Sequence, residues 1–188
     1  EALWPDREPG AATAQLHQAT SALRRVLEPE LPDKFPSRYL LFDEGVVRLC
    51  LPPGSWVDHV VFTQLARTQR FEEALALWGG EPFPDDRYAD WAAMPCEELR
   101  AHYLRTLLAL AQQHFEAGEM AEARDLCRRL LTEEPWHEEA ALLGMRACVA
   151  LGDRVDAIRL YRTLEATLHD ELGIAPQAAL QALYQSLL

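Results

Sequence analysis

Hydrophobic residues recur at helical spacing through most of the chain that follows residue 56. Spacings of three and four residues place apolar side chains on one face of a helix. They form two consecutive stripes: Leu104, Leu107, Leu108, Ala111 and Phe115, then Ala140, Leu143, Ala147 and Leu151. The pattern predicts a mainly helical protein whose helices pack against one another.

Two helical segments carry the same pattern. Residues 116–123 and 150–157 match at a shift of 34 residues, which is the period of tetratricopeptide repeats. In each copy a glycine, Gly118 or Gly152, is expected to end one helix. Helix pairs of this kind bury their apolar faces only by stacking on neighbours, so we expect an array with a concave binding surface.

Small residues and a third copy extend this interpretation. Ala123 and Ala157 follow the two glycines at the same distance, where two helices must approach closely. A weaker copy lies upstream, with a first helix expected at residues 60–67 and a second at 71–78. A cluster of proline and glycine at 52–54 separates the array from the preceding residues. We therefore expect tetratricopeptide-like helix pairs over residues 57–188.

The first 56 residues follow a different pattern. Residues 8–27 read as one amphipathic helix, with Pro9 at an early helical position. Two apolar segments, 38–42 and 46–51, flank Asp43-Glu44-Gly45 and predict a β-hairpin. A helix followed by a two-stranded ribbon is typical of the second half of a winged helix-turn-helix, in which the helix reads the major groove. The inward stripe of the helix is expected to consist of Leu16, Ala19, Thr20, Leu23 and Leu27.

The remaining side of that helix offers candidate contacts to DNA. Gln18 can pair with adenine, and Arg24 or Arg25 with guanine or phosphate. No acidic residue lies between Pro9 and Leu27. The candidate DNA-binding residues are Gln15, Gln18, Ser21, Arg24 and Arg25 on the helix and Arg48 on the ribbon.

Charge and composition narrow the class of protein. The 188-residue chain has a net charge of −12, which argues against a protein that coats nucleic acid. Residues 1–56 hold 8 acidic and 6 basic residues, whereas residues 57–188 hold 22 and 12, so the second part should repel phosphate. Apolar runs are too short for a membrane helix. The four cysteines form no C-x-x-C pair, which argues against a disulfide framework or a zinc ribbon.

Short motifs in both parts match one family pattern. In the first part they are Leu3-Trp4-Pro5-Asp6, residues 21–27 and Trp56-Val57-Asp58; in the array they are Ala117-Gly118, Ala123, Glu134-Pro135, Gly152, Ala157, Tyr161, Glu171-Leu172-Gly173, Pro176 and Leu183-Tyr184. These motifs resemble those of bacterial transcriptional activator domain regulators of the antibiotic-regulatory-protein (SARP) type. The most specific element is residues 170–176 followed by Leu-Tyr, because a plain repeat protein has no need of it.

The resemblance implies a division into two domains. Residues 1–56 would be the C-terminal part of a winged helix-turn-helix, and residues 57–188 a bacterial transcriptional activator domain. It also implies DNA binding through the complete winged helix, and RNA polymerase or another protein as the partner of the repeats. Residues 1–56 would hold the end of the family's second helix, the recognition helix and the wing hairpin. The family's opening strands, first helix and most of its second helix have no counterpart here, which suggests a fragment. Without them Leu3, Leu16 and Leu23 would lack partners, so we expect this segment to pack on the repeats or on another chain.

Catalytic and metal-binding sites have weaker support in the sequence. His17 and Ser21 lie four apart on one helix, but no carboxylate is spaced to orient the histidine for catalysis. Residues 133–139 combine acids with a histidine but lack the second histidine of H-E-x-x-H, so we expect a repeat junction rather than a metal site. We expect the following to be core residues: Cys127, Cys148, Trp78, Trp91 and Trp136.

The sequence therefore favours a cytoplasmic DNA-binding transcriptional regulator without a cofactor, rather than an enzyme or a membrane protein. Its repeats would bind RNA polymerase, a regulatory domain or a second copy of the chain. The alternative is a helical-repeat adaptor that recognises only a protein or peptide. The acidic tip at Asp43 and Glu44 favours that alternative, as do Ala14 and Ala22, where relatives often place a basic residue.

Overall fold

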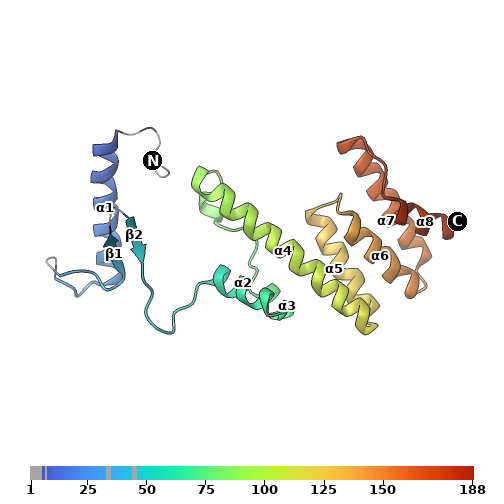
Figure 1. The fold of residues 1–188 in the computed structure, drawn as a ribbon, viewed down its shortest axis with the longest axis horizontal. Coiled ribbons are helices and arrows are strands. Elements are labelled where there is room, and N and C mark those ends of the chain that lie inside the picture. The colour runs from blue at the N-terminus through green and yellow to red at the C-terminus, as the bar shows by residue number, and fades with distance from the viewer. Residues whose placement is uncertain (1–5, 7, 33–34, 44–45) are drawn as a thin grey trace. The chain divides into compact units, whose positions relative to one another are not determined.

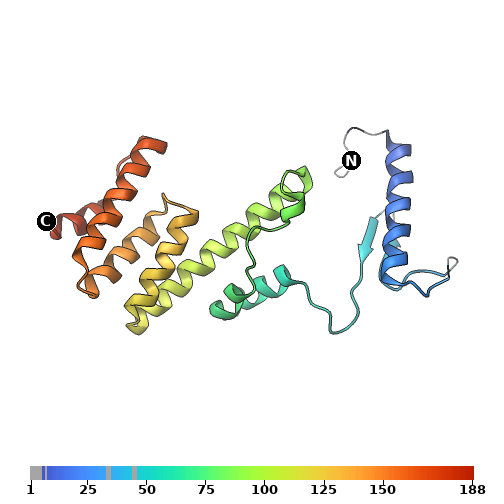
Figure 2. The same cartoon turned by 180° about the vertical axis from the view of Figure 1, so that it is seen from behind.

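The structure is a computed structural model that describes Asp6 and residues 8–32, 35–43 and 46–188. Leu3, at the start of the chain, and Glu44, at the tip of the expected hairpin, lie outside the described residues. The chain divides into two compact units, one of Glu1–Asp58 with Asp85–Pro95 and one of His59–Pro84 with Cys96–Leu188. Figures 1 and 2 show the elements of both units from opposite sides.

The first unit contains the predicted helix and hairpin. Helix α1 spans Pro9–Leu27 and has its proline in the first turn, where no hydrogen-bond donor is needed. Strands β1, Leu40–Asp43, and β2, Val46–Leu49, pair antiparallel in a two-stranded sheet. Both predictions are confirmed. Of the expected inward stripe only Thr20 is fully buried, while Leu23 and Leu27 keep 50% and 41% of their surface exposed.

Beyond the hairpin the described chain is helical, as predicted. The elements are α2 Asp58–Arg67, α3 Phe71–Ala76, the short 3₁₀ turn η1 Pro84–Asp86, α4 Asp90–Ala117, α5 Met120–Glu133, α6 Glu138–Ala150, α7 Arg154–Thr167, the π-turn η2 Leu168–Leu172 and α8 Ala178–Ser186. Helices α5 and α7 start 34 positions apart, as the repeat period requires. The expected first and second helices of the third copy are α2 and α3.

Equivalent turns join the helices of each pair. Gly118 and Gly152 have φ values of +85° and +78°, a left-handed conformation that glycine adopts at little cost. The amide that follows each glycine donates to a carbonyl five residues back, Glu119 N to His114 O at 2.8 Å and Asp153 N to Cys148 O at 2.9 Å. Between α2 and α3 the same bond joins Arg70 N to Leu65 O at 2.9 Å, and Gln69 stands in the glycine position with φ +61°. The turn of the third copy therefore has the same geometry as the other two.

Two apolar clusters form the core of the second unit. The first gathers around Phe62, Leu107 and Leu130, with Trp78 stacked on Tyr103 at a ring-centroid distance of 4.3 Å. The second has as its larger members Met145, Cys148, Tyr161, Leu164, Leu168 and Leu180. Trp78 thus packs in the core as expected. Trp91 and Trp136 do not, because 37% and 43% of their surfaces remain exposed.

Three helices meet at Gly144 on α6. A β-carbon placed there would lie 3.1 Å from Cβ of Cys127 on α5 and 3.2 Å from Cδ1 of Leu160 on α7. Cys127 and Cys148 are free, buried thiols, as predicted. Burial raises the pKa of Cys127 to about 12, so its thiol stays protonated and serves as a small apolar group.

Residues 170–176 turn the chain so that α8 covers the last helix pair. Helix α7 runs into η2, and Gly173 with φ +66° reverses the direction. Pro176 and Leu180 are buried, and the ring of Tyr184 stacks on that of Tyr161 at 4.1 Å. This packing explains why residues 170–176 and the Leu-Tyr pair occur together in one motif.

Candidate nucleic-acid interface

One face of α1 presents three of the predicted DNA contacts together. Gln18, Ser21 and Arg25 follow one another at i, i+3 and i+7, and all three are exposed. Nε of Arg25 donates to the carbonyl oxygen of Ser21 at 3.3 Å, which holds the arginine stem along the helix. The face therefore offers an amide, a hydroxyl and a guanidinium, the groups that hydrogen-bond to base edges and phosphates.

Two further candidates on α1 lie away from that face. Arg24 is four residues after the buried Thr20 and so shares its side of the helix; its guanidinium donates to the carbonyl oxygen of Pro32. Gln15 is half-buried, and its amide oxygen has no hydrogen-bond partner among the described residues. Arg24 thus contributes to fixing the loop after α1, a role that the sequence pattern did not indicate.

The hairpin packs on α1 through one of its two faces. In the register Leu40 pairs with Leu49 and Phe42 with Val47, so these four side chains share a face. Leu40 is buried, and the ring of Phe42 stacks on that of His17 at a centroid distance of 6.3 Å. The other face carries Leu41, Asp43, Val46 and Arg48.

Arg48 accordingly points to the opposite side of the ribbon from α1. It pairs with Leu41 across the strands, and both side chains are exposed. Asp43, the described acid of the tip, is exposed on the same face. A phosphate that approached this face would meet one cation and one anion, a weaker attraction than a purely basic wing would supply.

A carboxylate buried at the end of α1 fixes the start of the ribbon. The Glu28 side chain is only 7% exposed and accepts hydrogen bonds from the Ser37 hydroxyl and from the Arg38 amide, the latter at 3.1 and 3.2 Å. The Ser37 bond, reinforced by the Arg38 amide and charge, holds the pKa of Glu28 below its ordinary value. Sequence reasoning missed this contact, because the two partners are separated by a loop that follows no hydrophobic pattern.

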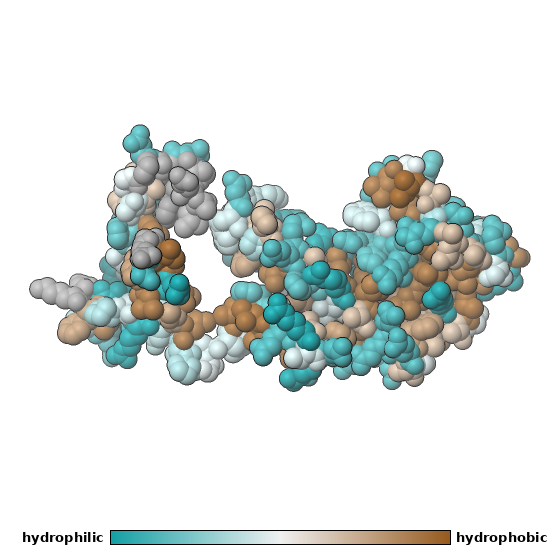
Figure 3. All heavy atoms as spheres, viewed as in Figure 1, coloured by the Kyte–Doolittle hydropathy of each residue, from teal (hydrophilic) through white to brown (hydrophobic). Residues whose placement is uncertain are grey.

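Apolar side chains remain at the surface of this unit. Exposed fractions reach 77% at Val26, 58% at Phe35 and 55% at Leu49. Brown, hydrophobic atoms are visible beside α1 and the hairpin in Figure 3. Such a cluster is typical of a surface that another segment covers.

Metal-ligand clusters and membrane-spanning helices are both absent from the part of the chain that the structure describes. No group of three or more histidine, cysteine, aspartate or glutamate side chains is arranged to hold a metal ion. No helix there has the length and apolarity required to cross a bilayer. His137, at the repeat junction, instead caps α6 by accepting a hydrogen bond from the amide of Ala140.

Comparison with known proteins identifies the class to which this architecture belongs. Residues 63–188, which cover α3 to α8 and the second half of α2, match the bacterial transcriptional activator domain. The chain belongs to that family, and the resemblance to SARP-type regulators is confirmed.

Individual relatives are similar over the whole chain. The regulatory protein AfsR of Streptomyces coelicolor is 28% identical over 201 residues, a match that covers 100% of this chain and 19% of AfsR. The transcriptional regulatory protein EmbR of Mycobacterium tuberculosis is 26% identical over 200 residues, 100% of this chain and 51% of EmbR. The chain therefore spans about a fifth of one relative and about half of the other.

A solved structure shares the fold. That of Mycobacterium tuberculosis EmbR in complex with a low affinity phosphopeptide superposes with a TM-score of 0.75 at 25% identity. The match covers 99% of this chain and 52% of that one, so it includes the helix and hairpin as well as the helix pairs.

Proposed function

We propose that this chain is part of a DNA-binding transcriptional regulator in which α1 is the recognition helix and the β1–β2 hairpin is the wing. The observation that carries the proposal is the hairpin packed on α1 immediately before the helix pairs, in a chain similar along its full length to named regulators. Residues 1–56 form part of the DNA-binding module, and residues 57–188 form the activator domain.

The proposed contacts to DNA lie on α1 and on the wing. Gln18, Ser21 and Arg25 form the face that enters the major groove, where glutamine and arginine discriminate between base pairs. Gln15 and Arg24 flank that face, and Arg48 contacts phosphate from the outer side of the wing. The array, with most of the negative charge, takes a protein partner in the cytoplasm: RNA polymerase, a regulatory domain or a second copy of the chain.

The test is an electrophoretic mobility shift with the complete regulator on fragments of its promoters. Replacing both Gln18 and Arg25 by alanine removes two direct contacts, and each such contact contributes about 1–3 kcal/mol. We expect DNA affinity to fall by at least about ten-fold.

A matched control separates this effect from a general loss of charge or stability. Arg105 and Gln112 are exposed residues of the same two types on α4, and their replacement by alanine should leave the mobility shift unchanged. If the Gln18/Arg25 variant shifts DNA as well as the control does, α1 is not the recognition helix. If the unmodified regulator shifts no promoter fragment at low salt, the adaptor hypothesis replaces the proposal.

A further inference from the structure

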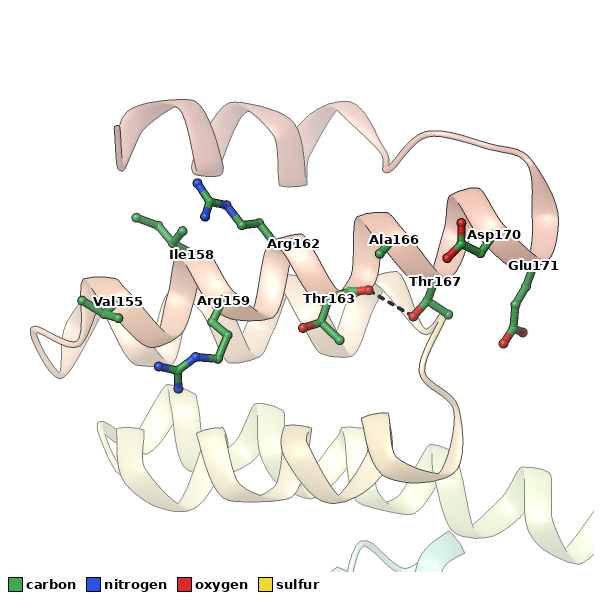
Figure 4. Close-up of a pocket in the computed structure, with 9 residues that line it drawn as sticks. All are labelled: Val155, Ile158, Arg159, Arg162, Thr163, Ala166, Thr167, Asp170 and Glu171. Carbon is green, nitrogen blue, oxygen red and sulfur yellow. Dashed lines mark hydrogen bonds between the residues drawn. The ribbon is translucent and has the colours of Figure 1, made fainter.

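The outer face of α7 is open to solvent along its length. A groove of about 660 Å³ is lined only by residues of α7 and η2 (Figure 4). The core-facing side of the same segment carries Ala157, Tyr161, Leu164 and Leu168, all of them buried. On the open side Val155 is 66% exposed, so an apolar side chain begins this face.

Charges along this face are ordered by sign. Arg159 and Arg162 occupy its first half, and Asp170 and Glu171 occupy its end. Arg159 is 71% exposed and pairs with Asp156 at 2.6 Å, while Nε of Arg162 donates to the Tyr184 hydroxyl at 3.4 Å. Asp170 and Glu171 are both exposed to solvent. An exposed i, i+3 pair such as Arg159–Asp156 is weak, so Arg159 remains available to another carboxylate.

Small side chains separate the two charged halves. Thr163 and Ala166 lie at the centre of the groove, and both are exposed. Arg159 lies four positions before Thr163, and Asp170 lies four positions after Ala166. The face therefore has the same length of chain on either side of its centre, with a cation at one end and an anion at the other.

We propose that a second copy of the chain packs on this face, α7 against α7 in antiparallel orientation, about a two-fold axis between Thr163 and Ala166. That axis brings Arg159 of each copy opposite Asp170 of the other. A two-fold interface uses the same patch on both subunits, so the patch must be self-complementary, which an ordered pair of opposite charges satisfies. This deepens the proposed function, since it names the protein partner of the activator domain and the surface that receives it.

The order of positive and negative residues along this face also favours a second copy of the chain over an acidic or a basic partner. A chain of one sign would be attracted to one half of the face and repelled by the other. A second antiparallel copy pairs both halves at once. The small residues at the centre allow the two helix backbones to approach closely.

Sedimentation velocity on the 188-residue chain tests the proposal, at concentrations from about 1 to 200 µM and near physiological salt. We expect a dimer whose dissociation constant rises at least about ten-fold in Arg159→Glu, and likewise in Asp170→Arg, because each places like charges opposite each other twice. An equimolar mixture of the two variants should restore the dimer. In the mixed dimer the glutamate introduced by Arg159→Glu meets the arginine introduced by Asp170→Arg, and the unchanged Arg159 and Asp170 also pair.

Arg146→Glu on α6 is the matched control, because it changes net charge equally at an exposed position outside the groove. It should associate like the unmodified chain, and circular dichroism should show all variants to be equally folded. A monomer over the whole concentration range would overturn the proposal, as would a mixture that associates no better than its components. Neither result bears on DNA binding through α1, which the mobility shift measures separately.

Discussion

Gln69 occupies a backbone conformation that the two equivalent turns reserve for glycine. Its φ of +61° lies in the left-handed region, where a side chain that carries a β-carbon costs roughly 1 kcal/mol. The turn still forms, because the amide of Arg70 gains its hydrogen bond to Leu65 and α3 packs against the core. Packing therefore outweighs local backbone preference at this residue.

Substitution at these turns should change stability in opposite directions. We expect Gln69→Gly to raise the free energy of unfolding by about 0.5–1 kcal/mol, and Gly152→Ala to lower it by about 1 kcal/mol or more. Urea denaturation followed by circular dichroism measures both.

Gly10 supplies the control for this comparison, because it is a glycine without a left-handed backbone conformation. It lies in the first turn of α1, has no positive φ, and a β-carbon there would meet nothing within 4 Å. Gly10→Ala should therefore stabilise α1 through helix propensity, by roughly 0.5–1 kcal/mol. A loss of stability in Gln69→Gly would show that the left-handed turn is not strained.

Glu28 makes the join between α1 and the ribbon sensitive to pH. Its pKa is lowered in the folded protein, chiefly by the Ser37 hydroxyl, so the folded pKa lies below the unfolded value near 4.5. A group with a depressed folded pKa contributes its stability above the unfolded pKa and loses it as pH falls through the folded pKa. The contact should therefore be intact near neutrality and lost only in acid.

Hydrogen exchange at the Arg38 amide measures this effect. We expect protection, corrected for the intrinsic rate, to decrease as pH falls from about 5 to about 2 in the unmodified chain. In Glu28→Gln, which cannot ionise, protection should be weak and independent of pH over that range. Equal pH dependence in both chains would assign the titration to another group.

At the scale of elements, the tight contact at Gly144 sets the spacing of α5, α6 and α7. Valine there would add carbon atoms where Cβ alone already lies 3.1–3.2 Å from its neighbours. We expect Gly144→Val to lower the free energy of unfolding by about 1–3 kcal/mol despite removal of a helical glycine. Thermal unfolding measures this loss of stability. The control is Ala150→Val, at an exposed position of the same helix. An unchanged melting temperature in Gly144→Val would mean that the three helices can separate freely.

The sequence was sufficient to predict elements whose contacts are local or periodic. The repeat of Gly118 and Gly152 located the starts of α5 and α7, and the apolar segments on either side of residues 43–45 located the hairpin. Contacts between distant residues were not predictable in the same way. The Glu28–Ser37 bond has no periodic signature, and Trp136 lies at a helix junction where hydrophobicity alone does not distinguish core from surface.

For the candidate interface, the sequence selected the helix but did not resolve its faces. Gln18 and Arg25 lie on the exposed face as expected. Arg24 differs from Arg25 by one position, yet one helical step of about 100° turns it toward the loop at Pro32. Assigning individual side chains required the geometry of the loop after α1, which helical periodicity does not give.

At the scale of the whole molecule, charge separates the two proposed tasks. Residues 57–188 carry a net charge of −10 and residues 1–56 a net charge of −2. In the proposed function, phosphate would repel residues 57–188 and keep them off the duplex, so contact with DNA would concentrate at the few basic residues of α1 and the hairpin. The proposed protein association on the array would then be free of competition from nucleic acid.

Helix α8 has a consequence for how such regulators diversify. Leu180 on α8 and Leu187 just after it are buried against the last helix pair, so α8 covers an apolar face that this pair would otherwise expose. A solenoid sealed in this way can be fused to unrelated modules without exposing its interior. The matched region forms 19% of one relative and 51% of another, so this architecture occurs beside very different lengths of additional chain.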